Sequence, residues 1–177
     1  LLGNQKAGIR KSACELVKNV GVISIKDEGW NNLINILCNA TQSNEIKFKL
    51  SSIKTIGLLC DSLSKNAFSI EDNNNMENSI IKLILNPTDI ELSLETIKTY
   101  QIFISYIKNK FENKEYLENS LKMFIPYFDT NSKIYNEDVA IEAIHVISAL
   151  IIAAYDYMQP HFKNFSAFLL TLCKGKI

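Results

Sequence analysis

The chain has 177 residues, of which 47% are hydrophobic and 21% charged, and its 19 basic residues balance its 19 acidic ones. This composition is typical of a globular protein, and a net charge of zero gives no field that would draw the chain to nucleic acid or to an anionic membrane. The longest apolar run, 143–155, is too short to span a bilayer, so we expect no membrane insertion.

Apolar residues recur at helical spacing from the start of the chain, and no stretch alternates as a strand would. A first helix is predicted over 5–25, a second over 28–40 and a third from about 45 to Ser64. The second helix opens with the only tryptophan, and its apolar stripe has the spacing i, i+3, i+4, i+7, i+8. The residues of this stripe are Trp30, Leu33, Ile34, Leu37 and Cys38.

The middle of the chain continues the series of helices. The polar stretch 71–75 is predicted to be a solvated loop, and a short helix over 76–85 stops before Pro87, because the residue before a proline leaves the helical region. Thr88 or Asp89 can cap the next helix, which we expect to run to about Lys110.

The C-terminal third predicts three more helices, over 115–128, over 136–157 and from Pro160 to about 174. The shorter helices carry their first apolar residues at Trp30, Met76, Leu117 and Phe162, which are 46, 41 and 45 residues apart. This step matches the two-helix HEAT or armadillo unit of roughly 40–47 residues.

We therefore predict an all-α fold, a HEAT-repeat α-α superhelix that occupies 1–177 as one solenoid. Helix pairs are expected at 28–64, 76–110 and 115–157, and partial repeats at 1–25 and 160–174. Each hairpin can bury its apolar face only against a neighbour, so Trp30 is expected to pack across the junction between two hairpins. Since the chain starts at Leu1 without a methionine and ends just beyond a helix, we also expect it to be part of a longer protein.

The sequence offers no residues for a reaction centre. His145 and His161 have no nucleophile or carboxylate placed to suggest a triad, and there is no glycine-rich phosphate loop. We expect His145 to be a hydrogen-bonded residue of the core or of a groove. The four cysteines lack metal-ligand spacing and are predicted to be small buried hydrophobes; they are Cys14, Cys38, Cys60 and Cys173. The prediction is a protein that is not an enzyme and has no catalytic residue, cofactor or metal.

Four segments in sequential order resemble importin-β, the karyopherin family of nuclear transport receptors. They are GWNNLINILCNAT, EIKFKLSSIKTIGLLCDSL, NSIIKLILNP and ETIKTYQIFISYIKNKF. At the positions of 30–34 in this chain, the family has a tryptophan, a proline, an acidic residue and an apolar pair. At the positions of 57–60, the family has a glycine, an aromatic residue, an apolar residue and a cysteine. The segment 137–162 is similar to a long inner helix of the family. The likeness extends from about Gln5 onward and implies the N-terminal region of the receptor.

The resemblance implies a right-handed superhelix with the longer helices on its concave face. The partners it implies are the GTP form of the Ran GTPase on that face, FG-repeat nucleoporins on the convex side, and the importin-α adaptor or cargo. The implied location is the cytoplasm and nucleus and the pores of the nuclear envelope. The alternative is a HEAT-repeat scaffold subunit of another multiprotein complex.

The matching positions of the FG-nucleoporin groove are Ile81, Glu118 and Leu121, between the helices at 76–85 and 115–128. For Ile81 and Leu121, membership of the hydrophobic core is an equal alternative. Where the family has further apolar side chains, this chain has Glu77, Asn78 and Lys122.

Overall fold

The computed structural model describes residues 1–26, 32–131, 135–155, 159 and 166–167. Within these ranges the regular structure is helical and no strand occurs, which confirms the all-α class. Trp30 lies outside the described residues, as do His161, Cys173 and nearly all of the helix predicted over 160–174.

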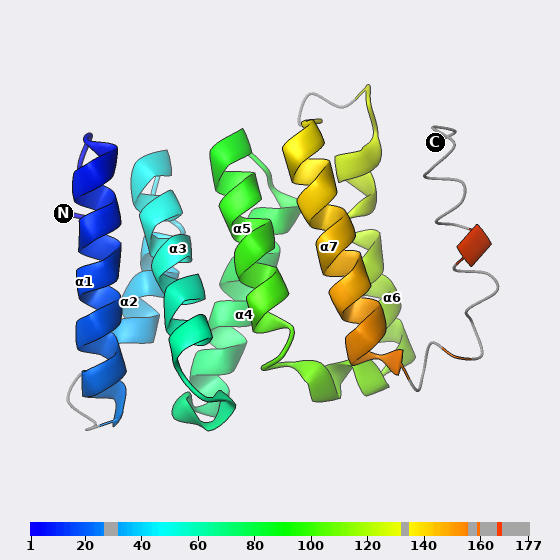
Figure 1. Cartoon of the computed structure of the whole chain (residues 1–177), viewed down its shortest axis with the longest axis horizontal. Coiled ribbons are helices and arrows are strands. Elements are labelled where there is room, and N and C mark those ends of the chain that lie inside the picture. Colours follow the sequence, from blue (N-terminus) through cyan, green and yellow to red (C-terminus); the bar gives the residue numbers. More distant parts are fainter. Residues whose placement is uncertain (27–31, 132–134, 156–158, 160–165, 168–177) are drawn as a thin grey trace.

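The helices form two layers (Figure 1). In the first layer lie α1 (Ala7–Lys26), α3 (Ile46–Ser62), α5 (Ile90–Phe103) and α7 (Glu137–Ala153), each packed beside the next. Behind them lie α2 (Leu33–Ala40), α4 (Ile70–Leu85) and α6 (Lys114–Lys122), each packed on the first-layer helix that follows it in the chain. The chain therefore alternates between the layers as it advances along the molecule.

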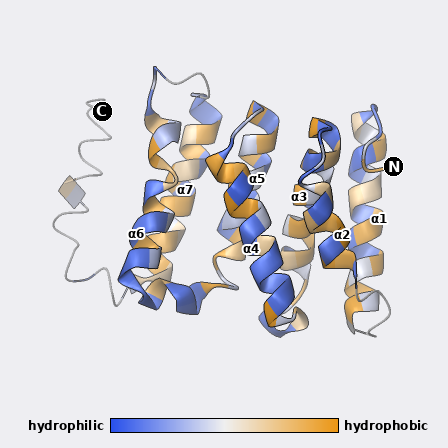
Figure 2. Ribbon diagram, turned by 180° about the vertical axis from the view of Figure 1, so that it is seen from behind, coloured by the Kyte–Doolittle hydropathy of each residue, from blue (hydrophilic) through white to orange (hydrophobic). Residues whose placement is uncertain are grey.

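Apolar side chains meet between the two layers, whereas much of the outward surface of α4 and α6 is polar. Seen from behind, α4 and α6 present mostly hydrophilic residues (Figure 2). The core runs through every pair of helices and includes Leu33, Leu37, Ile53, Ile56, Leu59, Met76, Ile80, Ile97, Tyr100, Phe103, Phe111, Phe124, Ala143, Val146 and Leu150. One continuous core thus links successive pairs.

The first-layer helices repeat at a regular interval. They begin at Ala7, Ile46, Ile90 and Glu137, which are 39, 44 and 47 residues apart. The tripeptide Ile-Lys-Thr occurs at 53–55 and again at 97–99, at the same position in α3 and α5.

The approach of α3 to α5 depends on a glycine. A Cβ added at Gly57 would lie 2.8 Å from the Oγ1 of Thr99, whose hydroxyl donates a hydrogen bond to the carbonyl of Ile53 at 3.2 Å. Gly57 is the first residue of the segment 57–60 that resembles the importin-β family. A close contact between two first-layer helices explains why a glycine stands there.

The prediction of a solvated loop at 71–75 is wrong, because these residues lie in the first turns of α4. Ser69 and Asp72 make a capping box: the Asp72 amide donates to Ser69 Oγ at 3.0 Å, and the Ser69 amide donates to the Asp72 carboxylate at 3.2 Å. Glu71 and Asp72 also place negative charge at the positively polarised end of the helix. As a result α4 has 16 residues and α5 only 14, so the second-layer helix of this pair is not the shorter one.

The helix predicted to reach Lys110 ends at Phe103 instead. The chain turns there and then forms the 3₁₀ helix η2 (Lys108–Glu112). The apolar side chains continue to be buried through the turn, which is why their spacing resembled a longer helix; they are Phe103, Ile104, Ile107 and Phe111. At the other end of α5 the predicted cap is confirmed, because Asp89 accepts a hydrogen bond from the Leu92 amide at 2.9 Å.

The helix predicted over 115–128 is also too long. α6 ends at Lys122, and the remainder is the 3₁₀ helix η3 (Ile125–Phe128), which contains Pro126 near its start. A proline has no N–H to donate and its ring collides with the preceding helical turn, so the α-helix cannot continue through it. The helix predicted over 136–157 ends as α7 at Ala153, and Asn136 caps its start by accepting from the Val139 amide at 3.2 Å.

Tyrosine hydroxyl groups cap the free carbonyls at two helix ends. The Tyr106 hydroxyl oxygen lies 2.6 Å from each of two carbonyl oxygens at the end of α3, those of Cys60 and Leu63, and can donate its one hydrogen to either. The Tyr127 hydroxyl donates to the carbonyl of Ile84, near the end of α4, at 2.7 Å. These carbonyls have no partner within their own helices, so each tyrosine ties one helix pair to the next.

We expect the protein to lose stability between pH 10 and 12. Burial raises the pKa of Tyr100, Tyr106 and Tyr127 to about 12, whereas an unfolded tyrosine titrates near 10. The unfolded chain therefore binds fewer protons in this window, and stability falls as the pH rises through it. Urea unfolding at pH 8, 10 and 11 measures the slope. Tyr100→Phe should flatten it, and an unchanged slope in that variant would refute the explanation.

Candidate functional site

Ion pairs link consecutive first-layer helices at equivalent positions. Lys54 Nζ lies 3.7 Å from the Glu95 carboxylate, joining α3 to α5, and Lys98 Nζ lies 3.5 Å from the Glu142 carboxylate, joining α5 to α7. Each lysine is the ninth residue of its helix, and each glutamate is the sixth of the next. We call these two pairs the ion-pair ladder. Exposed pairs of this kind add only about 0–1 kcal/mol each to the free energy of unfolding. The ion-pair ladder is therefore informative mainly because it shows that the same register between helices occurs at two junctions.

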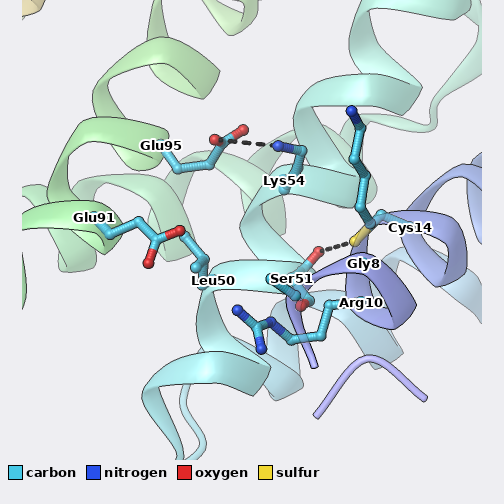
Figure 3. A pocket seen from close by; sticks show the side chains of 10 residues that line it. Gly8, Arg10, Cys14, Leu50, Ser51, Lys54, Glu91 and Glu95 are labelled. Carbon is cyan, nitrogen blue, oxygen red and sulfur yellow. Dashed lines mark hydrogen bonds and ion pairs between the residues drawn. The ribbon is translucent and has the colours of Figure 1, made fainter. Parts of the chain in front are cut away.

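The ladder does not continue between α1 and α3. Ser51 is the sixth residue of α3, where α5 and α7 have a glutamate, and its carbonyl accepts a hydrogen bond from the Cys14 thiol at 3.4 Å. The ninth residue of α1 is Glu15, which pairs with Lys18 of its own helix at 3.5 Å, so neither member of the lysine–glutamate pair is present at this junction. The surface is hollowed at this place, and we call the depression the inner hollow (Figure 3).

The inner hollow has a volume of about 260 Å³ and involves three successive first-layer helices. It is lined by Ala7, Gly8, Arg10, Lys11 and Cys14 of α1, by Leu50, Ser51 and Lys54 of α3, and by Glu91 and Glu95 of α5. A Cβ added at Gly8 would meet no atom within 4 Å, so the missing side chain leaves this side open.

Charges of opposite sign line opposite sides of the inner hollow. Arg10 and Lys11 come from α1, and Glu91 and Glu95 come from α5. Figure 3 labels Arg10, Glu91 and Glu95. The Arg10 guanidinium is fixed, because its Nη1 donates to the carbonyls of Asn4 at 2.9 Å and Gln5 at 3.0 Å, in the segment before α1.

The structure places the predicted groove residues in two environments. Ile81 and Leu121 are half-buried and pack against the continuous core. Glu118 is exposed and lies 3.8 Å from Lys114 and 4.0 Å from Lys122, both on its own helix. The FG-nucleoporin groove stays a prediction.

Glu77 has a role that the sequence did not suggest. It is only 5% exposed, and its carboxylate pairs with the Lys110 ammonium and accepts a hydrogen bond from the Tyr116 hydroxyl. Burial and this hydrogen bond raise the pKa of Tyr116. Lys110 also donates to the Asn74 side chain at 3.1 Å. The cluster of Glu77, Lys110 and Tyr116, which we call the buried clamp, joins α4 to η2 and α6.

A second hollow of about 240 Å³ lies between α2 and α4 on the second layer. Its lining is rich in carboxamides and consists of Asn35, Cys38, Asn39, Gln42, Asn75, Asn78, Ser79 and Lys82. Within it the Asn75 side chain donates to the Asn35 side chain at 2.8 Å. We call this depression the amide groove.

The histidine and cysteine predictions have mixed outcomes. His145 is not a core residue: its side chain is 54% exposed, and its Nδ1 lies 3.2 Å from the Glu142 carboxylate. Cys14, Cys38 and Cys60 are buried free thiols, as predicted. Over the described parts of the chain, no group of three or more histidine, cysteine or acidic residues could hold a metal ion, and no helix is long and apolar enough to cross a membrane.

Comparison with family models, with curated proteins and with solved structures finds no match for this chain.

Proposed function

We propose that this chain is a segment of a HEAT-type α-α superhelix that binds protein partners on its surfaces. The ion-pair ladder carries the proposal. Lys54–Glu95 and Lys98–Glu142 occupy the same helix positions at successive junctions, so one packing relation is applied twice. A solenoid grows by such repetition, and each repeat contacts only its neighbours. The intervals of 39, 44 and 47 residues between first-layer helices are close to those of a HEAT unit.

Within this class we propose a nuclear transport receptor of the importin-β type. The support is the ordered sequence resemblance, together with two first-layer helices that meet closely at the Gly57 of the quoted motif. The proposed partners are Ran-GTP on the first-layer face, FG nucleoporins on the second-layer face, and the importin-α adaptor or cargo. The proposed location is the cytoplasm, the nucleus and the nuclear pore.

The proposed mechanism is reversible binding without chemistry. Burying one phenylalanine side chain of a nucleoporin contributes roughly 1.5–3 kcal/mol, which is too little to hold a receptor in place. Several such contacts in series give residence with rapid exchange, because each bound contact raises the effective concentration of the next. Small changes in the packing of each repeat would then let Ran-GTP and cargo compete.

Binding to immobilised Ran loaded with GTP or with GDP tests the transport proposal. We expect the chain to be retained by the GTP form and not by the GDP form. Retention by neither form, or by both equally, would reject the transport receptor and leave the superhelix proposal standing.

The amide groove favours the second candidate, a HEAT scaffold subunit of another complex. Carboxamides donate and accept hydrogen bonds and so suit polar partners, whereas a phenylalanine ring needs an apolar pocket. The buried clamp points the same way, because Glu77 lies in a charged cluster where the family has an apolar residue. This candidate has the same fold and fails the Ran-GTP experiment.

A further inference from the structure

We propose that the inner hollow docks an extended peptide segment of a protein partner that carries one acidic and one basic residue. The acidic side chain would lie against Arg10 and Lys11, and the basic side chain against Glu91. The inference deepens the proposed function, because it rests on the first-layer face being a binding surface.

The size of the inner hollow favours an inserted segment over a small molecule. Its volume of about 260 Å³ is below that of pockets that enclose drug-sized ligands, roughly 300–1,000 Å³. Its sides come from three helices, so a segment lying across α3 would reach both charged sides at once. The small residues Gly8, Cys14 and Ser51 leave the space that such a segment would occupy.

Some charged side chains around the inner hollow are already paired with each other, and others are not. Lys54 and Glu95 neutralise each other at 3.7 Å. Lys11 and Glu91 are exposed and take part in no ion pair within the described residues, although both line the hollow. Arg10 is held in place by two backbone carbonyls, which reduces the entropy lost when it binds an anion.

Opposite charges on opposite sides give the site its selectivity. A segment carrying both charges meets a complementary charge on each side, whereas a segment of a single sign is repelled by one of them. The other first-layer junctions do not offer this arrangement, because Lys54–Glu95 and Lys98–Glu142 already pair their charges.

The proposal is tested by fluorescence anisotropy with four labelled peptides of equal length. One carries an acidic and a basic residue, one two acidic residues, one two basic residues and one no charge. We expect the mixed peptide to bind on the order of tenfold more tightly than the others. Lys11→Glu should move the preference to the basic peptide, and Glu91→Lys should move it to the acidic peptide.

Two further variants complete the test. Gly8→Leu fills the inner hollow and should weaken mixed-peptide binding by about tenfold; circular dichroism checks that the variant folds. Lys108→Glu, which makes the same charge change as Lys11→Glu but at an exposed residue of η2, should alter nothing. Equal affinities for all four peptides, or unchanged binding by Gly8→Leu, would overturn the proposal. If Ran-GTP binding is present while peptide selectivity is absent, only the present inference fails.

Discussion

Replacing Lys110 by alanine should lower the free energy of unfolding by about 3 kcal/mol, at the lower end of the cost of breaking a buried ion pair. Lys110 neutralises the Glu77 carboxylate, which is 5% exposed, while its own side chain is 42% exposed. Removing the lysine leaves a buried carboxylate that, among the described residues, keeps the Tyr116 hydroxyl as its one hydrogen-bond donor. Removing Glu77 should lower the free energy of unfolding by less, because the Lys110 ammonium can then reorient into solvent.

Urea denaturation of four proteins decides this prediction. Lys110→Ala is compared with Lys114→Ala, which removes one partner of an exposed pair with Glu118 and should change stability by less than about 0.5 kcal/mol. The double variant Lys110→Ala with Glu77→Leu should regain most of the loss, since it leaves no unpaired charge in the core. If Lys110→Ala and Lys114→Ala cost the same, the buried clamp does not stabilise the junction.

Much of the helical order could be predicted from the sequence, and the errors have local causes. The first helix, the cap at Asp89 and the buried cysteines followed from apolar spacing and capping chemistry. The end of α5 did not, because Ile104, Ile107 and Phe111 continue to be buried after the backbone has left the α-helix. The spacing of apolar residues indicates which side chains are buried, and a buried stretch can continue past the residue at which the helix ends.

For two other helix boundaries that were predicted wrongly, the sequence contains a residue pattern that indicates the correct boundary. Pro126 stood inside the predicted helix over 115–128 and marks the start of η3. The Ser69 and Asp72 pair, three residues apart, is the spacing of a capping box, yet the asparagines that follow suggested a loop. In each case a local rule about backbone hydrogen bonding predicts the boundary better than the average polarity of the segment.

The sites were less predictable than the helices, because they depend on which residues face each other. Glu77 is spaced with Ile80, Ile81 and Ile84 on one side of a helix, which indicates burial, but nothing in the sequence names Lys110 as its partner. The inner hollow depends on the register between α1 and α3. The repeated Ile-Lys-Thr at 53–55 and 97–99 could have indicated equivalent helices, although not that Ser51 would stand where the later helices have a glutamate.

Phe111→Ala should cost about 3–5 kcal/mol, as large-to-small changes of a fully buried aromatic residue do. Phe111 is 0% exposed, and its ring centroid lies 5.5 Å from that of Tyr116. In a linear array of hairpins the damage should stay near the affected pair, because each repeat contacts only its neighbours. Hydrogen exchange should therefore show lost amide protection in α6 and α7, with little change in α1 and α2.

The matched variant is Leu33→Ala, at a residue of α2 that is 1% exposed. It should give the opposite pattern, with protection lost in α1 to α3 and retained in α7, at a cost of about 2–5 kcal/mol. A globule that unfolds as one cooperative unit would instead lose protection throughout in both variants. The pair of exchange maps thus measures whether the repeated junctions of the ion-pair ladder belong to a solenoid, on which the proposed function depends.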